Sequence, residues 1–263
     1  MDFLNLKCFG VGDGTAGTER FLSSFLYQFP ETSLVLDCGE PLSRSFKAAG
    51  FSYDAFDHIF ISHLHSDHFG GFFMFLQSLW LQGRTRPLTV HLPGEGIAPV
   101  RQMLNASYLF DELLPFTLTF QPHKAGKSAT VGTVQVTPFK TTHLADLEKR
   151  YSARYPGSYE AFCFLMESPG LRIGHSGDLG SPRDLDSLLE RPLDLLVCEL
   201  AHFTPEELFA SLRGRSVRTL AFIHLASEYW ANREGLLQHA RRKLPETEIV
   251  IASDNGTVAV KGL

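Results

Sequence analysis

The sequence predicts an α/β fold. Short apolar runs typical of buried strands alternate with segments of helical periodicity from one end of the chain to the other. No long linker, low-complexity block or run of like charges interrupts them, and 44% of the 263 residues are hydrophobic. An α/β chain of this length can bury one sizeable core. We therefore expect residues 1–263 to form a single domain.

The expected elements follow one another in a regular order. A strand at residues 3–9 leads through a glycine-rich turn to a hairpin at 21–29 and 33–37. The turn lacks the Gly-Lys-Ser/Thr ending of a phosphate-binding loop. A helix at 41–49 ends at Gly50, because glycine readily adopts the left-handed conformation that closes a helix. Further strands are expected at 56–62, 88–92, 118–121, 131–137, 161–167, 172–176, 193–198, 220–224, 248–252 and 257–260; helices are expected at 70–81, 96–104 and 205–212, and residues 228–243 complete the alternation.

Four potential metal ligands lie within six residues. His63, His65, Asp67 and His68 directly follow the apolar run 56–61, which has the sequence FDHIFI. A strand that ends in a loop rich in ligands is a rigid mount for a metal ion. Three imidazoles and one carboxylate suit zinc, manganese or iron. The sequence therefore predicts a metal site at the end of this strand.

Three more candidate ligands lie in similar places. His143 follows a strand-like run at 134–139, Asp178 follows one at 171–177, and His224 follows one at 219–223. Each lies where an expected strand stops, which is the placement required when one site is built from several strand ends. Together with the first four, they give seven potential ligands, enough for two metal ions.

The motifs resemble those of a known superfamily. HLHSDH at 63–68 is similar to the HxHxDH signature of the metallo-β-lactamase superfamily, and the later candidate ligands match its remaining ligand positions in order. DCGE at 37–40 and QGRTRPL at 82–88 resemble segments of the ribonuclease Z-like branch. The resemblance covers nearly the whole chain. It implies a four-layer αβ/βα sandwich, in which two mixed β-sheets pack face to face with helices outside.

The resemblance also implies roles for the site residues. His63, His65 and His143 would bind one divalent cation, and Asp67, His68 and His224 the other, with Asp178 bridging them. Two such cations, zinc first and manganese or iron as alternatives, can hold a bridging hydroxide and lower its pKa. Asp67 would thus lie beside the nucleophile, and Asp37 would orient a ligand imidazole. His202, with Glu199 behind it, is the candidate proton donor to a leaving alkoxide.

One departure from ribonuclease Z bears on the substrate. That branch carries a long arm, which it uses to grip tRNA, between the third-histidine segment and the Gly-Asp turn. Here only residues 144–159 remain between two expected strands, and they are rich in basic and aromatic side chains: Lys149, Arg150, Tyr151, Arg154, Tyr155 and Tyr159. Such a segment can act as a short lid that binds a phosphate and stacks a base, or it can be an ordinary solvated loop.

A dinuclear phosphodiesterase acting on RNA or on a small phosphodiester, such as a cyclic nucleotide, is the first functional hypothesis. The second is a lactonase or thioesterase with the same site. The third is a non-catalytic metal-binding protein or a cofactor-biosynthesis member. The net charge of −5 argues against a broad nucleic-acid surface.

Composition and apolar patterning predict the cellular setting and the assembly. The four cysteines are far apart in apolar runs, as expected for buried thiols in a reducing cytoplasm. No signal peptide or membrane span is expected. Residues 69–81 carry apolar side chains on too many sides for one buried stripe. With the resemblance, this pattern predicts a partly exposed apolar patch and a homodimer. The alternative is a helix that is simply buried between a sheet and its neighbour.

Overall fold

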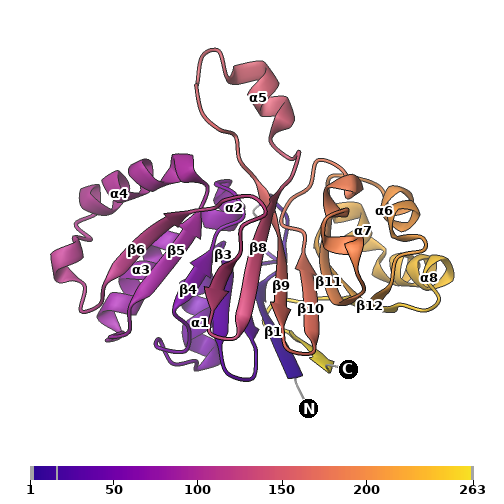
Figure 1. Ribbon diagram of the computed structural model, residues 1–263, viewed down its shortest axis with the longest axis horizontal. Helices are drawn as coiled ribbons and strands as arrows, with labels where there is room; N and C mark the ends of the chain where they lie inside the picture. Colours follow the sequence, from indigo (N-terminus) through magenta and orange to yellow (C-terminus); the bar gives the residue numbers. More distant parts are fainter. Residues whose placement is uncertain (1–2, 16, 262–263) are drawn as a thin grey trace.

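Two seven-stranded mixed sheets lie face to face in the computed structural model, which describes residues 3–15 and 17–261 (Figure 1). In the first sheet the strand order is β14 (Thr257–Lys261), β1 (Phe3–Gly10), β2 (Ser24–Gln28), β3 (Ser33–Cys38), β4 (His58–Phe60), β5 (Leu88–Leu92) and β6 (Leu118–Pro122). In the second it is β13 (Glu248–Ile251), β12 (Val217–Leu225), β11 (Leu193–Leu200), β10 (Leu171–His175), β9 (Phe162–Ser168), β8 (Val134–Lys140) and β7 (Ala129–Val131). Strands β3 to β6 pair in parallel, as do β10 to β13, and the other pairs are antiparallel.

Helices cover the outer faces of both sheets. Those of the first half are α1 (Leu42–Ala49), α2 (Ser66–Phe69), α3 (Phe72–Leu81) and α4 (Ile97–Ala106); those of the last third are α6 (Pro205–Leu212), α7 (Ser227–Ala231) and α8 (Arg233–Lys243). Short 3-10 helices lie at Gly94–Gly96, Asp111–Leu113, Pro182–Leu185 and Leu188–Glu190. Helix α5 (Ala145–Tyr151) covers no sheet and stands away from the body (Figure 1).

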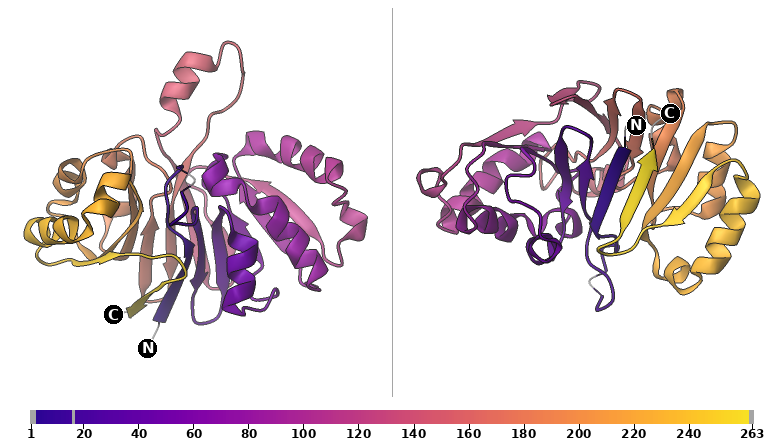
Figure 2. Two further views of the ribbon diagram at one scale, coloured as in Figure 1. Left: turned by 180° about the vertical axis from the view of Figure 1, so that it is seen from behind. Right: turned by 90° about the horizontal axis from the view of Figure 1, so that it is seen from below.

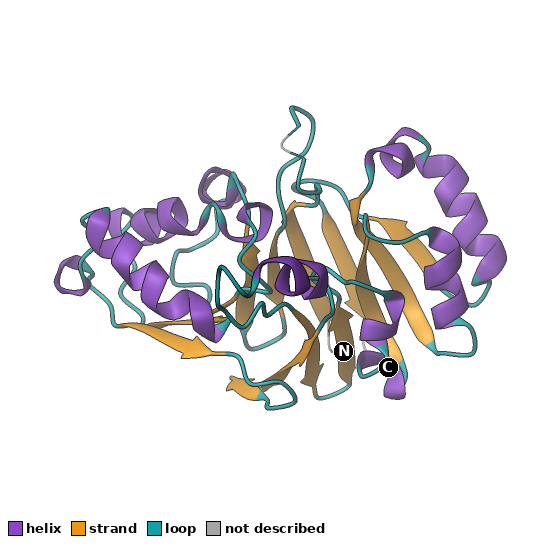
Figure 3. Ribbon diagram, turned by 90° about the horizontal axis from the view of Figure 1, so that it is seen from above, coloured by secondary structure: helices purple, strands orange, loops and turns teal. Residues whose placement is uncertain are grey.

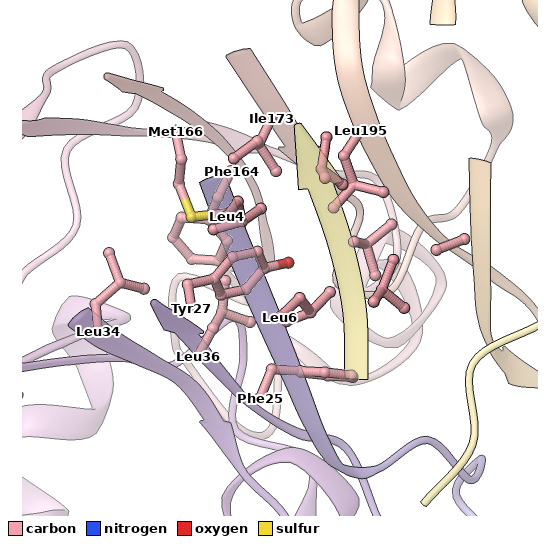
Figure 4. Close-up of a cluster of buried hydrophobic side chains, with 14 of the residues drawn as sticks. Leu4, Leu6, Phe25, Tyr27, Leu34, Leu36, Phe164, Met166, Ile173 and Leu195 are labelled. Carbon is pink, nitrogen blue, oxygen red and sulfur yellow. The ribbon is translucent and has the colours of Figure 1, made fainter. Parts of the chain in front are cut away.

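The packing has three apolar layers. Between the sheets lies a cluster that includes Leu4, Leu6, Phe25, Tyr27, Leu34, Leu36, Phe164, Met166, Ile173 and Leu195 (Figure 4). Alternation along each strand supplies these side chains, since every second residue faces the partner sheet. The opposite faces pack against the helices through one cluster centred on Phe46, Phe72 and Phe75 and another around Leu208, Phe222 and Leu236. The predicted four-layer sandwich is therefore confirmed.

Local differences from the sequence prediction have physical causes. The helix expected at 70–81 is α3, which begins at Phe72, and the short helix α2 precedes it; at Gly71, between the two, a Cβ atom would lie only 2.8 Å from the carbonyl oxygen of Cys38. Residues 228–243 are interrupted at Asn232, whose side chain accepts a hydrogen bond from the Gly235 N–H and caps α8. The segment 144–159 contains α5, which the sequence analysis did not predict.

Of the apolar side chains at residues 69–81, some face the core and others remain exposed, as the sequence predicts. Phe72, Phe75, Leu76 and Leu79 are buried, and the half-buried Phe69, Phe73 and Trp80 pack against the same core cluster. On α3, the large hydrophobic side chains that remain exposed are Met74, at 50%, and Leu81, at 60%. Most of the helix is enclosed between the sheet and its neighbours, because the sheet and α1 together take up more than one stripe of its surface. No helix among the described residues is long and apolar enough to cross a bilayer.

Candidate metal centre

The predicted ligands converge at one edge of the sandwich. The loop after β4 carries His63 and His65, and α2 carries Asp67 and His68. The other three residues come from the second sheet: His143 follows β8, Asp178 follows β10, and His224 is the penultimate residue of β12. Figure 3 looks down on this edge, with α5 standing over it near the centre. All seven sequence-predicted ligands therefore lie together.

One group consists of His63, His65, His143 and Asp178. Each offers a ligand atom, and these atoms all lie within 4.8 Å of one another. Asp178 Oδ2 lies 3.8 Å from His63 Nε2 and 3.7 Å from His143 Nε2. His143 Nε2 lies 3.2 Å from His65 Nδ1. Three imidazoles and one carboxylate thus lie close enough together to share one cation.

A second group adjoins the first and shares Asp178. It contains Asp67, His68 and His224, and its ligand atoms also lie within 4.8 Å of one another. Asp178 Oδ1 lies 3.1 Å from His68 Nε2 and 3.7 Å from His224 Nε2. Asp67 Oδ2 lies 3.1 Å from His224 Nε2. The two oxygens of one buried carboxylate therefore face two different ligand groups.

The donor set fits metal ions. His63 Nε2, His68 Nε2 and Asp178 Oδ1 are buried and make no hydrogen bond among the described residues. Buried polar atoms in folded proteins nearly always have a partner, because each unsatisfied one costs about 1–3 kcal/mol. Here the two imidazole nitrogens without a partner, His63 Nε2 and His68 Nε2, both face the carboxylate of Asp178. Coordination of cations satisfies nitrogen and oxygen lone pairs placed in this way.

Asp37 holds His68 in position. The fully buried carboxylate of Asp37 accepts hydrogen bonds from Ser62 N–H at 2.7 Å and Ser62 Oγ at 2.8 Å, and it lies 2.7 Å from His68 Nδ1. This contact places the proton of the imidazole on Nδ1 and leaves Nε2 free to face the site. The role expected for Asp37 therefore matches its position. Ser62, which the sequence analysis passed over, secures the carboxylate.

Two glycines permit the loops to approach closely. A Cβ atom on Gly39 would lie 2.2 Å from the carbonyl oxygen of Asp67. Gly177 has a φ of 53°, and a Cβ atom there would lie 2.6 Å from the carbonyl oxygen of Phe162. Side chains at either position would push a ligand out of place. The DCGE and Ser-Gly-Asp motifs are thus explained by backbone contacts.

His202 lies at the rim, next to both ligand groups. Its Nδ1 lies 2.8 Å from Glu199 Oε1, and its Nε2 lies 4.0 Å from Asp178 Oδ2. Glu199 is fully buried and accepts backbone N–H groups from Leu179 and Ala201 as well. Glu199 thereby holds the imidazole of His202 in place, and Glu199, His202 and His224 form a third group of potential ligands whose atoms lie within 4.8 Å of one another. The His202 side chain is 34% exposed, so a bound molecule can reach it.

Burial and neighbouring charges set the protonation of the site. Burial alone raises the pKa of Asp178, but the charges of His68 and His224 outweigh it and hold that pKa well below its usual value. Burial lowers the pKa of His143 to about 4. Burial also lowers the pKa of His202, but the hydrogen bond and charge of Glu199 raise it above its usual value overall. Burial likewise lowers the pKa of His63 well below its usual value, whereas for His68 and His224 burial is outweighed by the charge of Asp178, which raises the pKa.

The QGRT segment has a structural role. Arg84 is fully buried and donates hydrogen bonds to the carbonyl oxygens of Tyr53 and Pro87 and to Asp57. Its guanidinium lies 5.2 Å from the ring of Phe56 and 5.6 Å from that of Phe116. Arg84 thereby joins the loop before β4 to the loop before β5, and it contacts none of the candidate metal ligands.

Comparison with known proteins agrees with this geometry. The chain is 25% identical to ribonuclease Z of Archaeoglobus fulgidus over 92% of its own length and 94% of that protein. Its fold matches the metallo-β-lactamase fold protein YhfI from Bacillus subtilis, with a TM-score of 0.76 and 16% identity over 97% of this chain and 99% of the other. It also matches the short form of human tRNase Z (ELAC1), with a TM-score of 0.74 and 17% identity over 98% and 99% of the two chains.

The resemblance to the ribonuclease Z-like branch of the metallo-β-lactamase superfamily is therefore confirmed. A family model described as anti-Pycsar protein Apyc1 matches residues 4–212, which is well over half of the sequence. The chain belongs to the Apyc1 family of anti-Pycsar proteins.

Proposed function

We propose that the protein is a metal-dependent phosphodiesterase of the metallo-β-lactamase superfamily. One observation carries the proposal: the two oxygens of buried Asp178 face two adjacent groups of ligand atoms. Paired cation sites of this kind suit displacement at phosphorus, since they neutralise charge on both the attacking and the leaving oxygen. The similarity to ribonuclease Z over nearly the whole chain supports the same class of reaction.

We assign two divalent cations to the centre, and zinc is the preferred ion because the donors are imidazole nitrogens and carboxylate oxygens. His63, His65 and His143 would hold one cation, Asp67, His68 and His224 the other, and Asp178 both. When bound, such a pair supplies an activated water and neutralises the charge of the phosphodiester.

The remaining steps belong to the protein's own side chains. Asp37 keeps His68 oriented through its Nδ1, and Glu199 does the same for His202. With Nδ1 bound to Glu199, the Nε2 atom of His202 is the one that faces the site. We assign to this Nε2 the proton that passes to the leaving oxygen.

A small phosphodiester is the substrate class that the surface supports best. The segment between β8 and β9 is short. No residue of α5 is buried against the body, so this helix is not anchored firmly enough to hold a folded RNA. The net charge of −5 offers few phosphate contacts, which supply most non-specific affinity for nucleic acids. A cyclic nucleotide or another small diester needs only the centre and the side chains around it.

The decisive experiment compares substrate classes. Turnover of bis-p-nitrophenyl phosphate is measured against that of a lactone and a thioester, with zinc or manganese added, and precursor tRNA is tested at several salt concentrations. We expect hydrolysis of the phosphodiester and poor cleavage of the tRNA. Preferred turnover of the lactone or the thioester would overturn the proposal. Efficient, steeply salt-dependent cleavage of precursor tRNA would contradict the assignment of a small substrate.

We also propose a homodimer in the cytoplasm. The exposed Met74 and Leu81 on α3 offer a small apolar contact that a second copy can cover. The four cysteines are free and buried, as suits a reducing compartment.

A further inference from the structure

A cavity of about 300 Å³ lies between the two sheets, at the edge where β6 and β7 are the end strands. These strands lie at the opposite end of the sheets from β14 and β13, and in Figure 2 the chain is magenta to pink at the first pair and yellow at the second. The volume is at the lower end of the range for small-molecule sites. Because His91 and His123 line it, we call it the His91–His123 cavity. None of the seven candidate metal ligands is among the described residues of its wall.

Two imidazoles lie here, where the space between two sheets normally holds apolar side chains. His91 is 5% exposed and His123 is 8% exposed. The His91 ring stacks on that of Phe60, with 4.3 Å between the ring centres and 3° between the planes. His91 Nε2 lies 3.0 Å from His58 Nδ1, and His123 Nε2 donates to the carbonyl oxygen of Ile61 at 2.8 Å. Both rings are therefore held in fixed orientations.

Each of these two rings keeps one nitrogen for a ligand. Nδ1 of His91 and Nδ1 of His123 make no hydrogen bond with any described residue, and both rings line the cavity. Burial lowers the pKa of His91 to about 3 and that of His123 to about 4, so both rings are neutral at pH 7. A negative charge placed beside such a ring favours its protonated form, in which both nitrogens donate.

Two lysines give the rim of the cavity a positive charge. Lys124 and Lys127 line it and are exposed, and no Asp or Glu is among the described residues of its wall. Neither ammonium group forms an ion pair with a residue in the described ranges, whereas Lys140 on β8 pairs with Glu160 at 2.7 Å. Two neighbouring positive charges without a counter-charge attract an anion.

The turn that carries the lysines is fixed against β8. Gly126 has a φ of 70°, in the left-handed region that favours glycine, and its N–H donates to the carbonyl oxygen of Pro138 at 2.8 Å. The N–H of Lys127 donates to the carbonyl oxygen of Lys124 at 2.9 Å. The backbone of both lysines is therefore in place, and only their side chains have to order when a ligand binds, which lowers the entropic cost of binding.

We propose that the His91–His123 cavity binds a small organic anion, at a site separate from the metal centre. The carboxylate or phosphate group of this anion is held by the two lysines and by the Nδ1 atoms of the two imidazoles. Its apolar part contacts Phe60, Ala129 and Pro138, which also line the cavity. The volume admits a molecule of the size of benzoate or phenyl phosphate and excludes a polymer.

One residue joins the cavity to the metal centre, and this decides which side chains to change. Ile61 donates its N–H to the carbonyl oxygen of His91 at 2.8 Å and accepts the hydrogen bond of His123. It lies two residues before His63, a proposed metal ligand. Because substitution of His123 would release Ile61 and so disturb His63, the lysines are the residues that test the cavity alone.

The first test follows backbone amides by nuclear magnetic resonance. Zinc-loaded protein is titrated with benzoate, with phenyl phosphate and, as the neutral control for the ring, with benzamide. We expect saturable shifts of the Gly126 and Ser128 amide signals with an anion and none with benzamide. The anion with the lower Kd shows whether the cavity prefers a carboxylate or a phosphate. Equal shifts with benzamide, or no shift with either anion, would overturn the proposal.

The second test removes the charge at the rim. Lys124→Gln and Lys127→Gln keep most of the side chain, and each should raise the Kd of the preferred anion about tenfold, because each loses a charge-assisted hydrogen bond. Lys47→Gln removes another exposed lysine, on α1 outside the cavity, and should leave the Kd unchanged. A rise of the same size in all three variants would show a general effect of net charge and contradict the proposal.

The cavity assignment and the proposed function can fail separately. The signals of Gly126 and Ser128 report on the cavity, and that of Gly177 reports on an anion at the metal centre. If anions shift the first two signals but no diester is hydrolysed, the proposed function fails and the cavity remains an anion site. If diesters are hydrolysed but these signals do not move, the cavity assignment fails and the phosphodiesterase stands.

Discussion

The metal centre and the α5 arm, residues 144–159, adjoin each other but are built in opposite ways. At the centre, His63, His68, Asp178 and His224 are each at most 3% exposed, and buried partners such as Asp37 hold them. Helix α5 directly follows His143 yet has no buried residue, and Tyr151 and Tyr155 are 47% and 57% exposed. Its return to the body is held where Glu95 accepts the N–H groups of Ser158 and Glu160.

The difference indicates a division of labour. Chemistry needs ligand atoms fixed to within a fraction of an ångström, and burial on strand ends provides that precision. Recognition of a substrate tolerates adjustment, and an exposed segment provides it. Substitutions at the centre should therefore lower kcat and metal content, whereas substitutions in the arm should raise KM.

The largest effect is expected at the centre itself. Asp67→Ala removes a proposed ligand and its charge. Loss of a residue that only hydrogen-bonds to a ligand typically costs about 10–100-fold, so kcat of Asp67→Ala should fall by more than that. Glu199→Gln keeps the size of the side chain and should cost less. Metal analysis should give close to two equivalents for the wild-type protein and fewer for Asp67→Ala. Equal kinetic losses in the two variants would contradict these roles, and hydrolysis by protein with no bound metal would contradict the mechanism.

A loss that depends on the leaving group is expected at His202. Loss of a general acid typically costs about 10²–10⁴-fold when the leaving group is a poor one. His202→Ala should therefore lower kcat strongly for a diester with an alkoxide leaving group, but only slightly for a p-nitrophenyl ester, whose leaving group needs no proton. Equal losses for the two substrates would show that His202 supports the centre without donating a proton.

A smaller effect, on KM alone, is expected in the arm. Arg150→Ala or Tyr155→Ala should raise KM for a charged diester severalfold, with little change in kcat. Glu95→Gln should act in the same direction, because it weakens the two hydrogen bonds that hold the end of the arm. Lys47→Ala, a substitution outside the arm, is the control. A fall in kcat without a change in KM would show that the arm takes part in the chemistry, as the metal centre does.

The smallest effect on activity is expected at α3. If Met74 and Leu81 form the dimer contact, Met74→Glu together with Leu81→Glu should give a monomer of normal kcat. Light scattering should report twice the 29.3 kDa chain mass for the wild-type protein and the single mass for the double variant. A wild-type protein of the single mass at micromolar concentration would remove the dimer from the proposal.

Some of the site was accessible from the sequence because its signals are local. HLHSDH brings four potential ligands together at a strand exit, and His143, Asp178 and His224 each follow a short apolar run. Asp37 and the His202–Glu199 pair could be proposed only through the family resemblance. Ser62 carried no signal, since a serine before such a loop is ordinary until its two hydrogen bonds to Asp37 are seen.

The sequence by itself determined the layered α/β architecture and the set of candidate ligands, because both depend on periodicity and on residue type at strand ends. Only the tertiary structure decided what lies around them. It enclosed most of α3, buried Arg84 beneath the sheet, and placed Arg20 on Trp230, which is 210 residues away in the chain. Such contacts depend on how the two sheets and their loops meet, and no local pattern encodes that meeting.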